Sequence, residues 1–162
     1  MDLEIAVDDP RAADVRELLA AHRAFSRAVT PAEYSFALDV DELAEPGVTF
    51  FSARSNGWLV GVAALKRLDD VHAEIKSMHT RQTRRRRGVG RALLHHVLDH
   101  ARAAGYRRVS LETGTNDEFI PARTLYERAG FEPCGPFGDY APSPYNTFMT
   151  ISLDATAEQD GA

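Results

Sequence analysis

The chain has 162 residues, of which 44% are hydrophobic, and its formal net charge is −5. This length and apolar content suffice for one packed core, so we expect a single domain over residues 3–153 and a frayed tail over 154–162. The acidic balance argues against a nucleic-acid or membrane-surface binder, because such proteins usually carry a wide basic face. The single cysteine, Cys134, excludes an internal disulfide and a cysteine-based zinc site.

The sequence shows no signal for membrane insertion or export. No apolar run reaches the roughly 18 residues of a membrane span. The N-terminus begins with Asp2 and Glu4 instead of a basic segment followed by an apolar one. We therefore expect a cytoplasmic protein.

The chain opens with a predicted strand and helix. Residues 3–7 alternate like a short strand, and Asp9-Pro10 followed by apolar residues at helical spacing over 15–22 predicts an amphipathic helix. Thr30-Pro31-Ala32-Glu33 has the capping-box pattern. It predicts a second helix within the segment that ends at Leu43.

Three consecutive antiparallel strands are predicted next. Asn56-Gly57 separates two β-rich runs, 48–55 and 58–65, and this dipeptide is typical of a tight hairpin. A turn at Asp69-Asp70 then leads into a third strand over 73–80.

The second half alternates helices and strands. Apolar residues at helical spacing predict a helix that starts near Gly88 and ends at Gly105. A strand over 108–112 and a helix over 121–129 follow. The segment 147–153 alternates as a final strand, and Phe131-Glu132 indicates a short one before it.

A basic loop lies directly before the helix that starts near Gly88. Six of the 19 Lys and Arg residues lie between Arg81 and Arg91, a stretch without an acid, so the other 13 face all 24 Asp and Glu residues. A helix N-terminus carries partial positive charge, so arginines there are unfavourable unless an anion binds. Gly88 and Gly90 let backbone N–H groups approach that anion. Since arginine binds phosphate oxygens in a bidentate manner, the pattern indicates a phosphate-binding loop.

Other interpretations of this loop are weaker. Solvated surface charge would not need the glycines. A Walker-type nucleotide loop requires Gly-Lys followed by Ser or Thr, which this segment lacks. A dinucleotide-binding fold is the runner-up, because Gly88-Val89-Gly90 opens a helix and Glu112 ends the next strand, where an acidic ribose ligand would lie. However, Leu93 stands where the third glycine of that fingerprint belongs.

The run Arg85-Arg86-Arg87-Gly88-Val89-Gly90 resembles the Arg/Gln-x-x-Gly-x-Gly/Ala loop of the GNAT superfamily, the acetyl-CoA-dependent N-acetyltransferases. Leu125-Tyr126-Glu127-Arg128-Ala129-Gly130-Phe131 is similar to the family's Leu-Tyr-x-x-x-Gly-Phe signature, and the element order agrees over residues 3–153. Three more segments resemble a subgroup of small bacterial acetyltransferases: Glu74-Ile75-Lys76-Ser77-Met78, Leu111-Glu112-Thr113-Gly114 and Cys134-Gly135-Pro136-Phe137-Gly138-Asp139-Tyr140.

The resemblance implies an α/β (α+β) GNAT fold, with a mixed sheet of six to seven strands, about four helices and a splay between the fourth and fifth strands. Acetyl-CoA would be the acyl donor, with its pyrophosphate on the basic loop and its pantetheine beside the fourth strand. Many family members also contact the cofactor through an Asn where this chain has Phe119, and Asn116 or Arg123 are the alternatives for that contact. The other residues implied in donor binding are Met78, His79, Thr80, Arg85, Arg86, Arg87, Gly88, Val89, Gly90 and Arg91.

Acetyl transfer to an amine requires a base, because a typical alkyl ammonium has a pKa of about 10. Glu74 and Glu112 lie on the two strands that flank the expected gap, and we favour Glu74 by a small margin. Either carboxylate could instead face solvent or form an ion pair, in the case of Glu74 with Lys76. Tyr126 matches the residue that, in the resembling family, protonates the departing CoA thiolate.

Metal and covalent chemistry are not expected. His96 and His100 lie four residues apart on a predicted helix, but with Asp99 and Arg102 they form its polar face. Cys134 has no paired histidine motif and stands in a Pro- and Gly-rich segment. These features favour direct transfer in a ternary complex.

The acceptor site is expected to be closed by segments 22–43 and 133–146. With Arg23 and Arg27, their aromatic residues suggest a small amine or an amino-acid-like acceptor. A catalytically silent acyl-CoA sensor is the alternative, although Tyr126 and the carboxylates argue against it. Family members often dimerise, so the resemblance also leaves a homodimer open. The aromatic residues are Phe25, Tyr34, Phe36, Phe137, Tyr140 and Tyr145.

Overall fold

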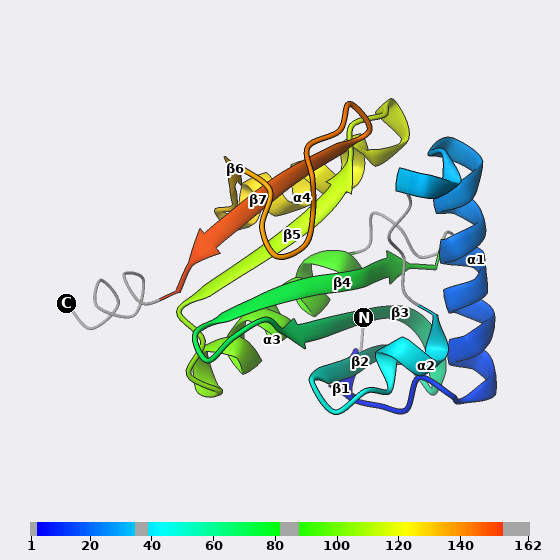
Figure 1. Cartoon of the computed structure of the whole chain (residues 1–162). Coiled ribbons are helices and arrows are strands. Elements are labelled where there is room, and N and C mark those ends of the chain that lie inside the picture. The colour runs from blue at the N-terminus through cyan, green and yellow to red at the C-terminus, as the bar shows by residue number, and fades with distance from the viewer. Residues whose placement is uncertain (1–2, 35–38, 82–87, 154–162) are drawn as a thin grey trace.

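The computed structural model describes residues 3–34, 39–81 and 88–153, and Figure 1 shows their arrangement. The described elements, in chain order, are β1 (Glu4–Val7), α1 (Ala13–Val29), the 3-10 turn η1 (Ala32–Tyr34), α2 (Val40–Leu43), β2 (Val48–Ser55), β3 (Trp58–Arg67), β4 (His72–Thr80), α3 (Val89–Ala103), β5 (Arg108–Gly114), the 3-10 turn η3 (Asp117–Phe119), α4 (Ile120–Ala129), β6 (Glu132–Cys134) and β7 (Asn146–Ser152).

The strands of the described residues form one seven-stranded sheet in the order β1-β2-β3-β4-β5-β7-β6. Strands β4 and β5 run parallel, and every other neighbouring pair is antiparallel. A parallel pair needs a crossover connection, which α3 provides. The mixed sheet and the helices that flank it confirm the predicted fold class.

The hairpin between β2 and β3 has the conformation that its sequence predicts. Asn56 and Gly57 both have positive φ, 52° and 83°, as a type I′ turn requires. Ser55 consequently pairs with Trp58, and after a one-residue shift of register between Ala53 and Arg54 the ladder extends to Val48 opposite Lys66.

Strands β4 and β5 diverge after four paired residues. Their ladder runs from His72 opposite Arg108 to Ile75 opposite Leu111, although β4 continues to Thr80. A bulge lies at the point of divergence, where the pairing of β4 with β3 shifts register and Ser77 has a φ of 56°. A bulge bends its strand and increases its twist. The divergence is visible in Figure 1 and confirms the predicted splay.

Helices cover both faces of the sheet. Helices α3 and α4 pack on one face in a cluster that includes Phe51, Leu93 and Val97, and α1 and α2 pack on the other through Leu18 and Leu43. The apolar stripe of α3 is buried as its spacing predicts.

The first helix differs from its prediction at both ends. It begins at Ala13, because Asp9 accepts the N–H of Arg11 in a separate turn, and it continues to Val29. Thr30 therefore ends α1, and its N–H bonds to Ser26. The capping-box pattern at Thr30 starts only the turn η1.

The capping box of this region lies further along the chain. Asp39 and Glu42 cap each other's backbone N–H groups at the start of α2. Residues 35–38, between η1 and α2, lie outside the described residues.

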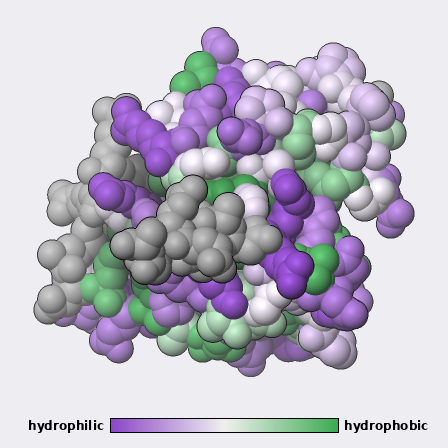
Figure 2. All heavy atoms as spheres, turned by 90° about the vertical axis from the view of Figure 1, so that its left-hand side faces the viewer, coloured by the Kyte–Doolittle hydropathy of each residue, from purple (hydrophilic) through white to green (hydrophobic). Residues whose placement is uncertain are grey.

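The helices that the structure describes include none long and apolar enough to cross a bilayer. On the face drawn in Figure 2, hydrophilic residues prevail and hydrophobic ones are scattered among them.

Candidate active site

A cleft of about 1140 Å³ lies where β4 and β5 diverge. Its walls come from these two strands, from the N-terminus of α3, from α4 and from one side of α1. It contains all three residues that the sequence analysis assigned to catalysis, namely Glu74, Glu112 and Tyr126. Residues from five separate elements, α1, β4, α3, β5 and α4, thus converge on one opening.

One end of the cleft is formed by the N-terminus of α3. Gly88 is the N-cap of this helix, with a φ of 80° and no side-chain cap. The first N–H groups of a helix have no intrahelical acceptor, so those after Gly88 are available to an anion. Gly90 and Arg91 line the cleft beside them, whereas Val89 is buried against Gly61. Arg85, Arg86 and Arg87 lie outside the described residues.

The bulged end of β4 forms one rim of the cleft. Met78, His79 and Thr80 line it, as predicted for the donor-binding strand. Because Val62 opposes His79 while Ala64 opposes Lys76, two residues of β4 face one of β3. Such a bulge leaves main-chain groups outside the ladder. Ser77, within the bulge, is buried, and its hydroxyl has no hydrogen-bond partner among the described residues.

Glu74 is hydrogen-bonded by the loop between β6 and β7, the two strands at one edge of the sheet. Its carboxylate is 3% exposed, accepts a 2.5 Å hydrogen bond from the hydroxyl of Tyr140 and lies 3.5 Å from the ammonium of Lys76. Lys76 also donates to the same hydroxyl at 2.8 Å. Burial and the charge of Glu74 raise the pKa of Tyr140, so its phenol stays protonated. The ion pair anticipated between Glu74 and Lys76 is therefore present, with Tyr140 as a third member.

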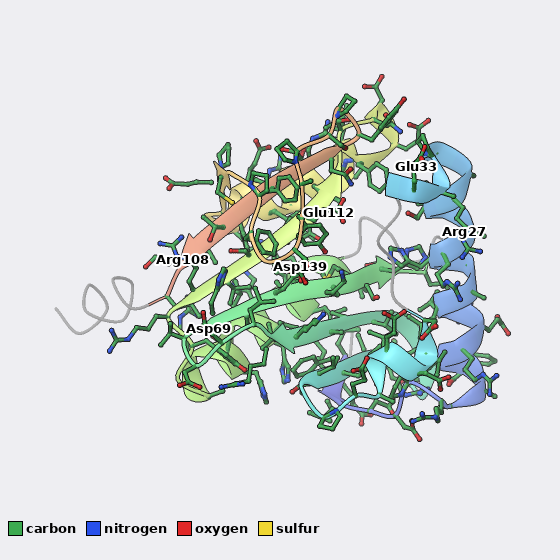
Figure 3. All side chains as sticks on the ribbon, viewed as in Figure 1. Arg27, Glu33, Asp69, Arg108, Glu112 and Asp139 are labelled. Atoms are coloured by element: carbon green, nitrogen blue, oxygen red, sulfur yellow. The ribbon has the colours of Figure 1, made fainter. Side chains whose placement is uncertain are left out.

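Tyr140 belongs to the loop between β6 and β7. The tip of this loop, marked by Asp139 in Figure 3, lies over the gap between β5 and β4. Its aromatic side chains pack on β7, since Phe137 and Tyr140 both make ring contacts with Phe148 and with each other. These aromatics of the loop thus cover the sheet and fix Tyr140.

Glu112, on β5, has a different environment. Figure 3 shows it on the wide side of the splay. Its carboxylate accepts a 2.6 Å hydrogen bond from the amide of Asn146, whose oxygen in turn accepts from Ser143 at 2.5 Å. Burial raises the pKa of Glu112, while Asn146 and the charge of Lys76 partly oppose that rise. A raised carboxyl pKa suits a group that takes up a proton near neutral pH.

Tyr126 lies on α4 and is 6% exposed. Its ring packs edge-on against Phe131, with centroids 5.7 Å apart. Burial and the negative charge of Glu112 raise the pKa of Tyr126. The phenol therefore stays protonated near neutral pH, as a group that is to donate a proton must be.

Asn116 and Arg123 bond to the protein backbone. The amide of Asn116 donates to the carbonyl of Val29, and Arg123 donates to the carbonyl of Gly114 at 2.7 Å. Both side chains thus brace the connection from β5 to α4, and a contact of either with the donor stays a prediction. Phe119 lines the cleft, and its ring lies where a side chain on Gly114 would be.

The remaining sequence candidates lie apart from the catalytic groups. The rings of His96 and His100 pack on Phe51. No group of three or more His, Cys, Asp or Glu residues suited to a metal occurs in residues 3–34, 39–81 and 88–153.

The cysteine and the arginines of the sequence analysis also lie apart from the catalytic groups. Burial raises the pKa of the Cys134 thiol, which lowers the fraction present as the nucleophilic thiolate. Arg27 is exposed on α1 (Figure 3) and does not line the cleft.

Two contacts of the site had not been inferred from the sequence. The sequence identifies Tyr140 only as an aromatic residue of its loop, although it is the last residue of the segment that resembles the bacterial subgroup. Asn146 had no signal at all, because its role depends on the register of β7 against β5, which places it at the end of the ladder opposite Gly114.

Comparison with known proteins identifies the family and the fold. The family model described as acetyltransferase (GNAT) family matches residues 13–131. The uncharacterized N-acetyltransferase YsnE of Bacillus subtilis is 42% identical over 93% of this chain and 100% of its own length. The IAA acetyltransferase of Azospirillum brasilense is 40% identical over 76% of this chain and 80% of its own. A Klebsiella pneumoniae structure, provisionally described as an acyl-CoA N-acyltransferase, superposes with a TM-score of 0.80 and 27% identity, covering 93% of this chain and 97% of the other.

Proposed function

The chain belongs to the acetyltransferase (GNAT) family, and we propose that it transfers an acetyl group from acetyl-CoA to the amine of a small acceptor, directly in a ternary complex. The observation that carries this proposal is the cleft in the splay, which has an exposed helix N-terminus at one end and two carboxylates with a buried tyrosine along its strands and α4. The helix N-terminus can bind the phosphates of an acyl donor. The carboxylates and the tyrosine can accept and donate the protons that amine acylation moves.

The donor would lie along α3 and β4. The backbone N–H groups after Gly88 take the pyrophosphate, assisted by the helix dipole and by the arginines of the preceding loop. The pantetheine arm would follow the bulged part of β4, and the main chain around Met78 and Thr80 would pair with it and polarise the thioester carbonyl. The bulge thus provides the groups that an amide-containing arm requires.

We assign the proton-accepting role to Glu112. The sequence pattern favoured Glu74, but Tyr140 and Lys76 both contact that carboxylate. Glu112 has a hydrogen bond from a neutral amide and a raised pKa. It is therefore the better matched of the two to an ammonium that must lose a proton.

The acetyl transfer then proceeds by the following proton and bond changes. Glu112 takes one proton from the ammonium, and the free amine attacks the thioester carbonyl. The C–N bond forms, the C–S bond breaks, and the departing thiolate takes the proton of Tyr126. The second proton of the nitrogen replaces the one that Tyr126 gave, and Glu112 releases the first proton to solvent, so the products are the acetamide and CoA.

One experiment tests the proposal as a whole. The protein is screened by thermal unfolding with acetyl-CoA, CoA and NAD, and thiol release from acetyl-CoA is followed with amines, amino acids and peptides. We expect stabilisation by both CoA species and thiol release that depends on an amine. Binding of acetyl-CoA without turnover on any amine would instead support a sensor, and stabilisation by NAD alone would support a dinucleotide-binding protein.

A further inference from the structure

The charges in the cleft are unevenly distributed between its walls. Arg91 on α3, Arg128 on α4 and Glu118 on η3 line the cleft on the helical side, together with the N-terminus of α3. On the strands, the charged lining residues are Glu74 and Lys76 on β4 and Glu112 on β5. The wall nearest the proposed chemistry thus has two carboxylates and one ammonium.

Lys76 is already engaged by its neighbours. Its side chain is 9% exposed, and its ammonium donates to Tyr140 at 2.8 Å and lies 3.5 Å from Glu74. Breaking this arrangement would leave Glu74 buried without its cation, which is strongly unfavourable. Lys76 is therefore a poor partner for a carboxylate on an incoming acceptor.

Glu112 has no cation of its own. Its carboxylate accepts a hydrogen bond from the neutral amide of Asn146, and among the described residues no Lys, Arg or His forms an ion pair with it, since the ammonium of Lys76 pairs with Glu74 and lowers the pKa of Glu112 only through its charge. The orientation of that amide is fixed, because the oxygen of Asn146 already accepts a hydrogen bond from Ser143. A partly buried carboxylate with a neutral partner attracts a cation.

The arginines that the sequence suggested for an acceptor carboxylate are elsewhere. Arg23 and Arg27 lie on α1 and neither lines the cleft. An acceptor with a carboxylate next to its amine would thus bring a second anion beside Glu112, whereas the described arginines that line the cleft, Arg91 and Arg128, belong to its helical side and Lys76 is engaged by Glu74 and Tyr140.

Resting on the proposed function, we infer that the acceptor is a cationic primary amine without a carboxylate beside its amino group. Its ammonium binds Glu112 and loses its proton there. The Glu74–Lys76–Tyr140 group provides a wall without net charge on the opposite strand. The selectivity arises from repulsion of an α-carboxylate as much as from attraction of the amine.

Matched acceptors test this inference. Tyramine and tyrosine, and agmatine and arginine, differ only in the α-carboxylate, and tyrosine methyl ester keeps bulk at that position without the charge. We expect kcat/KM to favour the amine of each pair by about tenfold or more, with the ester close to tyramine. Equal use of the pair, or preference for the amino acid, would overturn the inference and leave acetyl transfer intact.

A second measurement does not depend on turnover. Tyramine and tyrosine are titrated into the protein saturated with CoA, which cannot react. The wild type should bind tyramine about tenfold more tightly, and Glu112→Gln should bring the two dissociation constants together. Unchanged discrimination in Glu112→Gln would refute the role of Glu112. If CoA binds but no amine, ester or amino acid is acetylated, the proposed function fails, and this inference fails with it.

Discussion

The phenolic hydroxyl of Tyr140 donates a 2.5 Å hydrogen bond to the carboxylate of Glu74, although 66 residues separate the two in sequence. This bond attaches the loop between β6 and β7 to β4. Lys76 contacts both groups, so the three form one buried polar unit. In such a unit, the loss of one member leaves another without its partner.

Replacing Tyr140 by Phe should therefore destabilise the protein. Glu74 would lose its shortest hydrogen bond while remaining buried, at a cost of about 1–3 kcal/mol. The melting temperature should fall by about 2–4 °C for each kcal/mol. Denaturant unfolding of Tyr140→Phe measures the change. Tyr106→Phe is the matched control, because no hydrogen bond of its hydroxyl is seen in the described structure, and an equal loss in both variants would contradict the prediction.

Tyr126→Phe should lower turnover with little effect on donor binding. The variant removes the proton that the departing thiolate takes and keeps the ring that packs against Phe131. We expect kcat to fall by about 100-fold, the lower range for general acid catalysis. The dissociation constant for acetyl-CoA should stay unchanged, as measured by calorimetry. A variant with wild-type kcat would show that another group or water protonates the thiolate.

The raised pKa of Glu112 predicts a dependence of stability on pH. Burial raises this pKa above its ordinary value of 4.5, so the folded state holds the proton more tightly than the unfolded state does. The free energy of unfolding contributed by this group is greatest below pH 4.5 and falls as the pH rises through the folded-state value.

The comparison of Glu112→Gln with the wild type isolates that contribution. The stability of the wild type relative to this variant should decline as the pH rises from about 4.5 toward neutrality. Near pH 7 the variant should be at least as stable as the wild type, since it lacks a partly buried charge. Glu127→Gln, at an exposed position of α4, should show no such trend. A difference that grows with pH would reverse the sign and refute the prediction.

Ser77→Gly should stabilise the fold. Ser77 has a φ of 56°, a left-handed conformation that costs a non-glycine residue roughly 1–2 kcal/mol. Its buried hydroxyl also has no partner among the described residues. Even after the entropic cost of glycine, we expect a gain of about 1 kcal/mol in unfolding free energy. Ser55→Gly, at a buried position of β2 without a positive φ, should instead lose stability, and a loss at both positions would contradict the explanation.

The sequence predicts those parts of the fold that depend on local signals. The turn at Asn56-Gly57 needs two adjacent residues with positive φ, and the buried stripe of α3 follows from its 3.6-residue period. The placement of Glu74 and Glu112 beside one gap follows from the resemblance to the GNAT family, which implies a splay between the strands that carry them.

The contacts that define the roles of the two carboxylates are not local. Tyr140 reaches Glu74 only because the loop packs through Phe137 onto Phe148, and loop conformation has no periodic signature. Asn146 meets Glu112 because of the register between β7 and β5. The sequence could therefore name both carboxylates, and Lys76 as a possible partner of Glu74, but not the hydrogen bonds from Tyr140 and Asn146 that distinguish the two.

Gly88→Ala tests the proposed phosphate site separately from the chemistry. Gly88 has a φ of 80° at the N-cap of α3, and no atom lies within 4 Å of where a β-carbon would be placed. The strain of about 1–2 kcal/mol is therefore conformational, and relieving it turns the first N–H groups of α3 away from their present direction. We expect lower stability together with weaker binding of acetyl-CoA, measured by unfolding and calorimetry. Gly47→Ala, which also meets no neighbour but has no positive φ, should change neither. If Gly88→Ala lost stability but bound acetyl-CoA as the wild type does, the N-terminus of α3 would not be the group that holds the phosphates.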